Sequence, residues 1–106
     1  MKQFTNAEQT DKLIELGFER PKSEVECDLP KGDWRICSAG IRKAYSIGEL
    51  IEMLPKIYDS EGLLIGRHYM ADVWIVRYPT KILIHKEELV DALYDMIVKL
   101  KEEGVI

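Results

Sequence analysis

The side chains best suited to metal binding or nucleophilic chemistry are two cysteines and two histidines, namely Cys27, Cys37, His68 and His85. Zinc sites usually place cysteines about two to four residues apart and histidines about three to five apart. Here the cysteines are ten residues apart and the histidines seventeen apart. The spacing therefore predicts no metal site, and it favours small buried residues or idle thiols for the cysteines.

Catalysis would need a nucleophile, a base and donors for an oxyanion. Cys37 or Ser38 beside His68 could supply the first two groups, but the chain has no Gly-x-Ser-x-Gly turn. The segment 62–66 carries a glycine at each end, yet no Lys-Ser/Thr pair follows it, so it is not a phosphate loop. Gly66 instead predicts a bulge or a close backbone approach within a strand. We identify no catalytic residue and no cofactor, and we expect a protein that is not an enzyme.

Arginine and aromatic residues alternate through the middle of the chain. Arg35, Arg67, Tyr69 and Arg77 are the candidates for nucleic-acid binding, because aromatic rings stack on bases and arginines follow a phosphate backbone. The net charge of −4 opposes non-specific binding, since phosphate neutralisation supplies most of that affinity. The other interpretation is a solvated face of cations with the aromatic residues partly buried.

The helix boundaries are the structural features that the sequence marks most clearly. Thr5 to Glu8 has the pattern of a capping box, which predicts a helix over 6–16, and Gly17 with Phe18 predicts its Schellman end. A last helix is expected over 86–103, with Leu89, Leu93, Met96, Ile97 and Leu100 on its buried face and Gly104 after its end.

The second helix is expected over 47–54. Ser46 and Glu49 form its capping box, and Tyr45 and Leu50 stand at the positions of a hydrophobic staple. Pro55 disfavours helical geometry at the residue before it, so the helix should end there.

Strand patterns follow, over 62–70, 72–78 and 81–84, and two weaker patterns precede the second helix at 23–27 and 34–38. Residues 73–76 are apolar on both faces, which predicts a central strand. Ile82 and Ile84 alternate with Lys81 and Leu83, as in a half-exposed strand. Clustered strands favour an α+β fold, with a small antiparallel sheet of about three strands (a meander) and three helices packed mainly on one face.

Length and composition indicate one soluble domain over residues 1–106. Hydrophobic residues make up 46% and charged residues 32% of the chain, as in ordinary globular proteins. The N-terminus is too polar for a signal peptide. The longest clean apolar run, 73–76, is far shorter than the roughly 20 residues that span a bilayer. We therefore expect a cytoplasmic protein with reduced thiols and no membrane association.

Three stretches, 8–19, 45–56 and 88–104, resemble a group of small uncharacterised proteins of phages and mobile elements of gut bacteria. The resemblance covers about half of the chain. It implies an accessory role in a mobile element, and it carries over no catalytic or binding residue.

The leading hypothesis is a non-enzymatic accessory protein that acts by protein–protein interaction, with another protein or with itself. A small sheet has open edges that a partner can pair with. The last helix presents Glu87, Asp91, Asp95, Glu102 and Glu103, which could meet a basic partner or maintain solubility. The hypothesis predicts an exposed apolar patch or a free strand edge. Nucleic-acid contact through an Arg/Tyr-bearing sheet face is the alternative.

Overall fold

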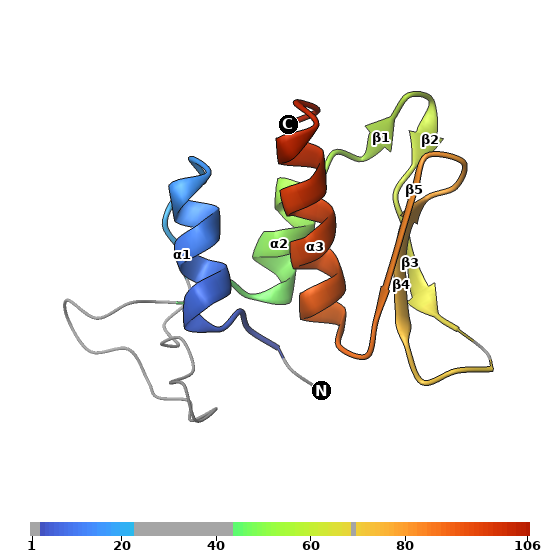
Figure 1. Cartoon of the computed structure of the whole chain (residues 1–106), viewed down its shortest axis with the longest axis horizontal. Coiled ribbons are helices and arrows are strands. Elements are labelled where there is room, and N and C mark those ends of the chain that lie inside the picture. The colour runs from blue at the N-terminus through green and yellow to red at the C-terminus, as the bar shows by residue number, and fades with distance from the viewer. Residues whose placement is uncertain (1–2, 23–43, 69) are drawn as a thin grey trace.

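The structure is a computed structural model, and it describes residues 3–22, 44–68 and 70–106. Figure 1 shows three helices beside a small set of strands. The elements in chain order are α1 (Ala7–Glu15), α2 (Ile47–Met53), β1 (Ile57–Tyr58), β2 (Glu61–Gly62), β3 (Leu64–Arg67), β4 (Trp74–Tyr78), β5 (Ile82–Lys86) and α3 (Leu89–Glu102).

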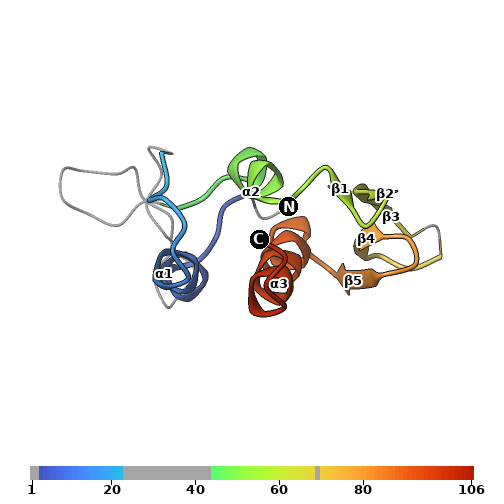
Figure 2. The same cartoon turned by 90° about the horizontal axis from the view of Figure 1, so that it is seen from above.

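The strands form two antiparallel sheets. One is the short hairpin β1–β2, and the other has the order β3–β4–β5 with β4 in the centre. All three helices lie on one side of the larger sheet, and α3 stands between α1 and the strands (Figures 1 and 2). The α+β prediction is confirmed, as is the central position of the strand that contains residues 74–76.

The first helix begins one residue later than the sequence pattern suggested. Asn6 is the N-cap, and its side chain accepts from the Gln9 backbone N–H while the Gln9 side chain accepts from the Asn6 N–H. The prediction of Thr5 as the cap is wrong because its hydroxyl lies 2.6 Å from that of Thr10 and accepts from the backbone N–H of Tyr45 at 3.0 Å. Thr5 therefore joins the chain before α1 to the chain before α2.

The end of α1 and both ends of α2 agree with the sequence. Ser46 and Glu49 form the reciprocal box of α2, and Leu54 before Pro55 is extended, with φ −87° and ψ 139°. Gly17 has φ 102°, and the Phe18 N–H donates to the Leu13 carbonyl at 3.2 Å, which is a Schellman closure.

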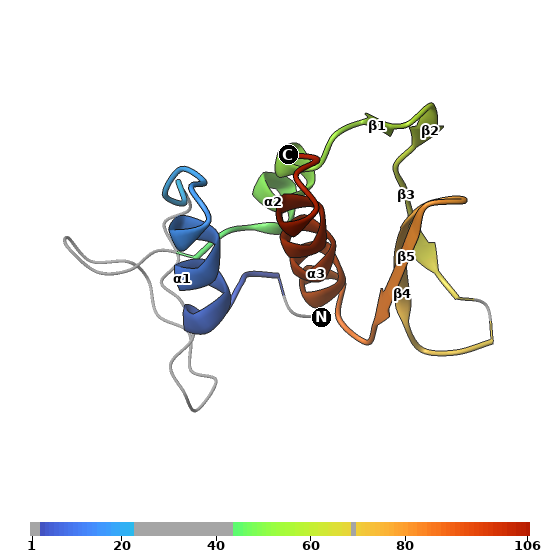
Figure 3. The same ribbon diagram turned by 45° about the horizontal axis from the view of Figure 1, so that its top comes forward.

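Helix α3 supplies half of the buried hydrophobic residues, because it packs against α2 and against strands β4 and β5 of the sheet (Figure 3). Its predicted buried face is confirmed, and Val90 and Ala92 are buried as well. The helix begins at Leu89 instead of 86, because Lys86 is still paired with Trp74 at the end of β5. Val105 and Ile106 are partly buried against the core.

The hairpin β1–β2 was not predicted. Its turn residues Asp59 and Ser60 have φ 49° and 69°, and positive φ at both central positions matches the twist of a two-residue hairpin. Two contacts join this hairpin to the turn between β4 and β5. The Asp59 carboxylate pairs with Lys81 at 2.6 Å, and the Glu61 carboxylate accepts from the Thr80 N–H and hydroxyl.

The expectation for Gly66 is wrong in the folded chain. The pairing of β3 with β4 runs without interruption from Leu64↔Arg77 to Arg67↔Trp74, so no bulge is present. In the described part of the chain, a Cβ at Gly66 would meet no atom within 4 Å, so no backbone there approaches it closely. The weak strand predictions at 23–27 and 34–38 lie outside the described residues, together with Cys27, Cys37, Arg35 and Tyr69.

Candidate interaction surface

The larger sheet has a covered face and an open face. Val76 and Tyr78 of β4 are fully buried against the helices, whereas Arg77 between them is exposed. Directly opposed residues of antiparallel strands share a face. The register therefore assigns two rows to the open face, which are Leu64–Arg77–Leu83 and Gly66–Ile75–His85.

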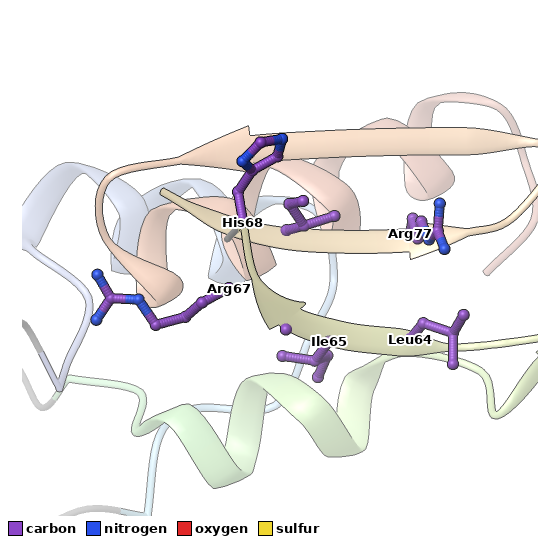
Figure 4. A pocket seen from close by; sticks show the side chains of 7 residues that line it. Leu64, Ile65, Arg67, His68 and Arg77 are labelled. Carbon is purple, nitrogen blue, oxygen red and sulfur yellow. The ribbon is translucent and has the colours of Figure 1, made fainter. Parts of the chain in front are cut away.

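The open face is apolar for a solvent-facing surface. Leu64 and Leu83 expose 47% and 49% of their surface, on either side of Arg77, and Ile75 is half-buried in the next row. Exposed aliphatic residues are ordinary when scattered singly, but a contiguous group marks a surface that other molecules cover. An open depression of about 360 Å³ lies along β3, and its lining includes Leu64, Gly66, Ile75 and Arg77 of the open face and Ile65 and Arg67 of the opposite face (Figure 4).

The two described arginines of the proposed nucleic-acid site do not point the same way. Arg67 pairs in register with Trp74, its guanidinium carbon lies 5.2 Å from the centroid of that ring, and it forms an ion pair with Asp72. Arg77 is on the open face, and no carboxylate of the described residues forms an ion pair with it. Figure 4 shows the Arg67 side chain extending away from Arg77. Arg35 and Tyr69, the other two candidates, lie outside the described residues.

Chemistry at the histidines has little support among the described residues. His68 Nδ1 accepts from the backbone N–H of Met70 at 3.0 Å, and His85 stands on the open face of β5. Within residues 3–22, 44–68 and 70–106, no group of three or more His, Cys, Asp or Glu could hold a metal ion.

The acidic face of α3 is largely engaged within the chain. Asp91 accepts from the Gln9 side-chain amide at 2.8 Å, and Asp95 pairs with Lys86 at 3.2 Å. Glu103 lies 3.8 Å from Lys99, one helical turn earlier. These contacts give the acidic residues structural partners, so the open sheet face is the stronger candidate for a binding surface.

Two pKa shifts accompany the packing around the sheet. Burial raises the pKa of Tyr78 to about 12, and its hydroxyl donates to the Pro55 carbonyl at 2.6 Å. Hydrogen bonds from Thr80 lower the pKa of the Glu61 carboxyl. Both groups serve the fold, because each joins the β1–β2 region to the larger sheet.

Both edges of the larger sheet are open among the described residues, since β3 and β5 each pair only with β4. All four residues of β3 are exposed, and β5 alternates between half-buried and exposed residues. The alternation of Ile82, Leu83 and Ile84 had already indicated that Leu83 faces solvent. The run Leu63–Leu64–Ile65 has no alternation, so the exposure of Leu64 could not be recognised from the sequence.

Comparisons of this chain with protein-family models, with curated proteins and with solved structures give no match. In the part of the chain that the structure describes, no helix is long and apolar enough to cross a membrane.

Proposed function

We propose that this domain is a non-enzymatic, cytoplasmic accessory protein that binds another protein through the open face of the β3–β4–β5 sheet. The observation that carries the proposal is the row of Leu64, Arg77 and Leu83, in which two half-exposed leucines flank an arginine that has no carboxylate partner among the described residues. The resemblance to proteins of phages and mobile elements supports an accessory role of this kind.

The chemistry of the face favours one class of partner. Burial of the leucines and Ile75 would supply the hydrophobic gain, at about 25 cal/mol per Å² of apolar surface removed from water. Arg77 would be buried with them, and a buried guanidinium needs a carboxylate that accepts from it. We therefore expect a partner that presents apolar side chains around an aspartate or glutamate.

The nucleic-acid alternative has less support from the geometry. Base stacking needs aromatic rings on the same face as the cations. The open face as described carries leucine, isoleucine, glycine, histidine and Arg77, whereas Trp74 and Arg67 pair with each other on the opposite side.

The test compares partners captured by the tagged full chain with those captured by two variants. Leu83→Glu places a charge on the open face, and Ile51→Glu is the matched control on α2, where Ile51 is 37% exposed. Circular dichroism and thermal unfolding verify that both variants fold. We expect a protein that survives nuclease treatment, is retained by Ile51→Glu and is lost with Leu83→Glu.

Two results would overturn the proposal. One is a set of captured proteins that Leu83→Glu does not change. The other is recovery that disappears after nuclease and weakens steeply as salt rises, because phosphate contacts depend on counterion release. The second result would establish the nucleic-acid alternative in its place.

A further inference from the structure

We propose that two copies of this chain pair through their β3 strands, antiparallel and around a two-fold axis at Gly66, to form one continuous six-stranded sheet. The pairing uses the edge of the sheet and shares Leu64 with the proposed partner surface, whereas Arg77 and Leu83 lie on the strands away from that edge. Its partner is a second copy of the chain.

The backbone of β3 offers a defined set of groups at its free edge. The His68 N–H donates to the Val73 carbonyl at 3.0 Å, so these two residues form a hydrogen-bonded pair of the β3–β4 ladder. Such pairs alternate along an antiparallel ladder. Gly66 and Leu64 are therefore bonded to β4, and the N–H and C=O groups of Ile65 and Arg67 point away from it.

Two-fold symmetry allows only registers in which a β3 residue lies opposite its own copy. An axis at Gly66 sets Ile65 opposite Arg67 of the second copy, and each such pair exchanges two N–H···O bonds. The four outward N–H and C=O groups of each strand then all have a hydrogen-bond partner. An axis at Ile65 would need the Leu63 N–H, which already donates to the Lys56 carbonyl at 3.0 Å.

Charge also favours the axis at Gly66. Arg67 is the one charged residue of β3, and it forms an ion pair with Asp72 of its own chain. With the axis at Gly66, each Arg67 lies opposite Ile65 of the other copy, so the two copies of Arg67 are two residues apart along the strands. That is roughly 7 Å along the strands, so the two arginines are not directly opposite each other. An axis at Arg67 would place the two guanidinium groups directly opposite each other.

Across this axis, the side chains of one copy fit those of the second copy. Glycine weakens the interior of a strand and often marks a place where another backbone approaches closely. Among the described residues of one copy, no backbone approaches Gly66 closely. In the pair, Gly66 faces its copy at the closely spaced position of about 4.5 Å between Cα atoms. Leu64 stands diagonal to Gly66 of the second copy, so the exposed leucine reaches the depression above that glycine.

The β3 edge is the better candidate of the two open edges. Natural proteins protect edge strands with lysines, prolines and bulges. Strand β5 ends in Lys86, and Lys81 directly precedes it. Strand β3 has no proline or bulge, and both Leu64 and Ile65 are exposed, the latter at 37%. Pairing would cover these two residues and leave the helices of both copies on one side of a common sheet.

The test exploits the position of Gly66 on the two-fold axis. The site is open and its φ is not in the positive range that excludes side chains, so the monomer accepts a substitution. Gly66→Asp would set two like charges about 5 Å apart in the dimer, whereas Gly66→Asn, with the same shape, would not. A four-residue edge forms a small interface, so we expect a wild-type dissociation constant of about 10 µM to 1 mM by sedimentation equilibrium.

We expect Gly66→Asp to weaken dimerisation about tenfold or more relative to Gly66→Asn, with unchanged circular dichroism. A mixture of Gly66→Asp and Gly66→Lys should associate more tightly than either variant alone. A wild-type chain that stays monomeric at 1 mM on the scale above, equal effects of Asp and Asn, or no gain in the mixture would overturn the proposal. Leu83→Glu should leave the dimer intact, which separates this outcome from a failure of the proposed function.

Discussion

Tyr78 connects the sheet to the end of α2 through one buried hydroxyl, and its removal should change stability in a pH-dependent way. The side chain is 0% exposed, and its hydroxyl donates to the Pro55 carbonyl at 2.6 Å. Its ring packs edge to face on Tyr58, with centroids 5.6 Å apart. Tyr78→Phe keeps the ring and this contact but deletes the donor. At pH 8 we expect the free energy of unfolding to fall by about 1–2 kcal/mol, because the carbonyl loses its partner.

The alkaline range gives the sharper test. Burial raises the pKa of Tyr78 from 10.0 to about 12 in the folded protein. The folded state therefore holds this proton more tightly than the unfolded state, and the stabilisation is complete below pH 10. It is lost as the pH rises from 10 to 12, because the unfolded state ionises first. The loss amounts to about 3 kcal/mol in total.

Urea denaturation of both proteins between pH 8 and 12, followed by circular dichroism, measures this directly. Tyr78→Phe should be less stable than the wild type at pH 8, and the two stability curves should converge and cross as the pH approaches 12. Other titrating groups are common to both chains and cancel in the difference. Parallel curves across the whole range would refute the argument, since they would mean that the folded state does not hold the Tyr78 proton more tightly.

Three further comparisons test the fold and the site. Ser46→Ala should lower the free energy of unfolding by about 1 kcal/mol in urea titrations, whereas Ser46→Asp should retain the cap. Equal stabilities of these two variants would contradict the capping role. Leu93→Ala, at a site with 0% exposure, should cost about 2–5 kcal/mol, but Leu83→Ala should cost less than about 1 kcal/mol. Thr80 lowers the pKa of Glu61. The wild type should therefore be more stable than Glu61→Gln above pH 4.5, and this difference in the free energy of unfolding should shrink as the pH falls through the lowered pKa of Glu61. A constant difference between pH 6 and 3 would exclude that contact as a source of acid sensitivity.

The helix ends were predictable because their hydrogen bonds are local. Ser46 and Glu49 need only each other, and Gly17 needs only the turn before it. The error at α1 has a long-range cause. Thr5 and Asn6 each have a suitable residue three positions later, and the choice between them depends on Tyr45, about 40 residues away, whose N–H uses the Thr5 hydroxyl.

The faces of the sheet were harder to predict, because they depend on register. The sequence placed Arg67 and Arg77 correctly in neighbouring strands. Two such residues share a face when one of them and the strand partner of the other are an even number of positions apart in the sequence, and they face opposite sides when that number is odd. A slip of one residue in the register reverses the result. The partner of Arg77 is Leu64, three positions from Arg67, so the two arginines face opposite sides. The turn that sets this offset carries no strong signal in the sequence.

The residues that stabilise the fold and the exposed leucines lie on opposite faces of the sheet, and this arrangement supports the interaction hypothesis. The helices cover one face of the sheet, and Val76 and Tyr78 on that face are fully buried. The leucines of the opposite face keep about half of their surface in water, so they contribute less to folding than buried leucines do. Lysine, threonine or glutamate at those positions would cost the fold little and would improve solubility. These leucines contribute little to folding, and they surround an arginine that has no carboxylate partner in the described chain. A partner that covers them explains both observations better.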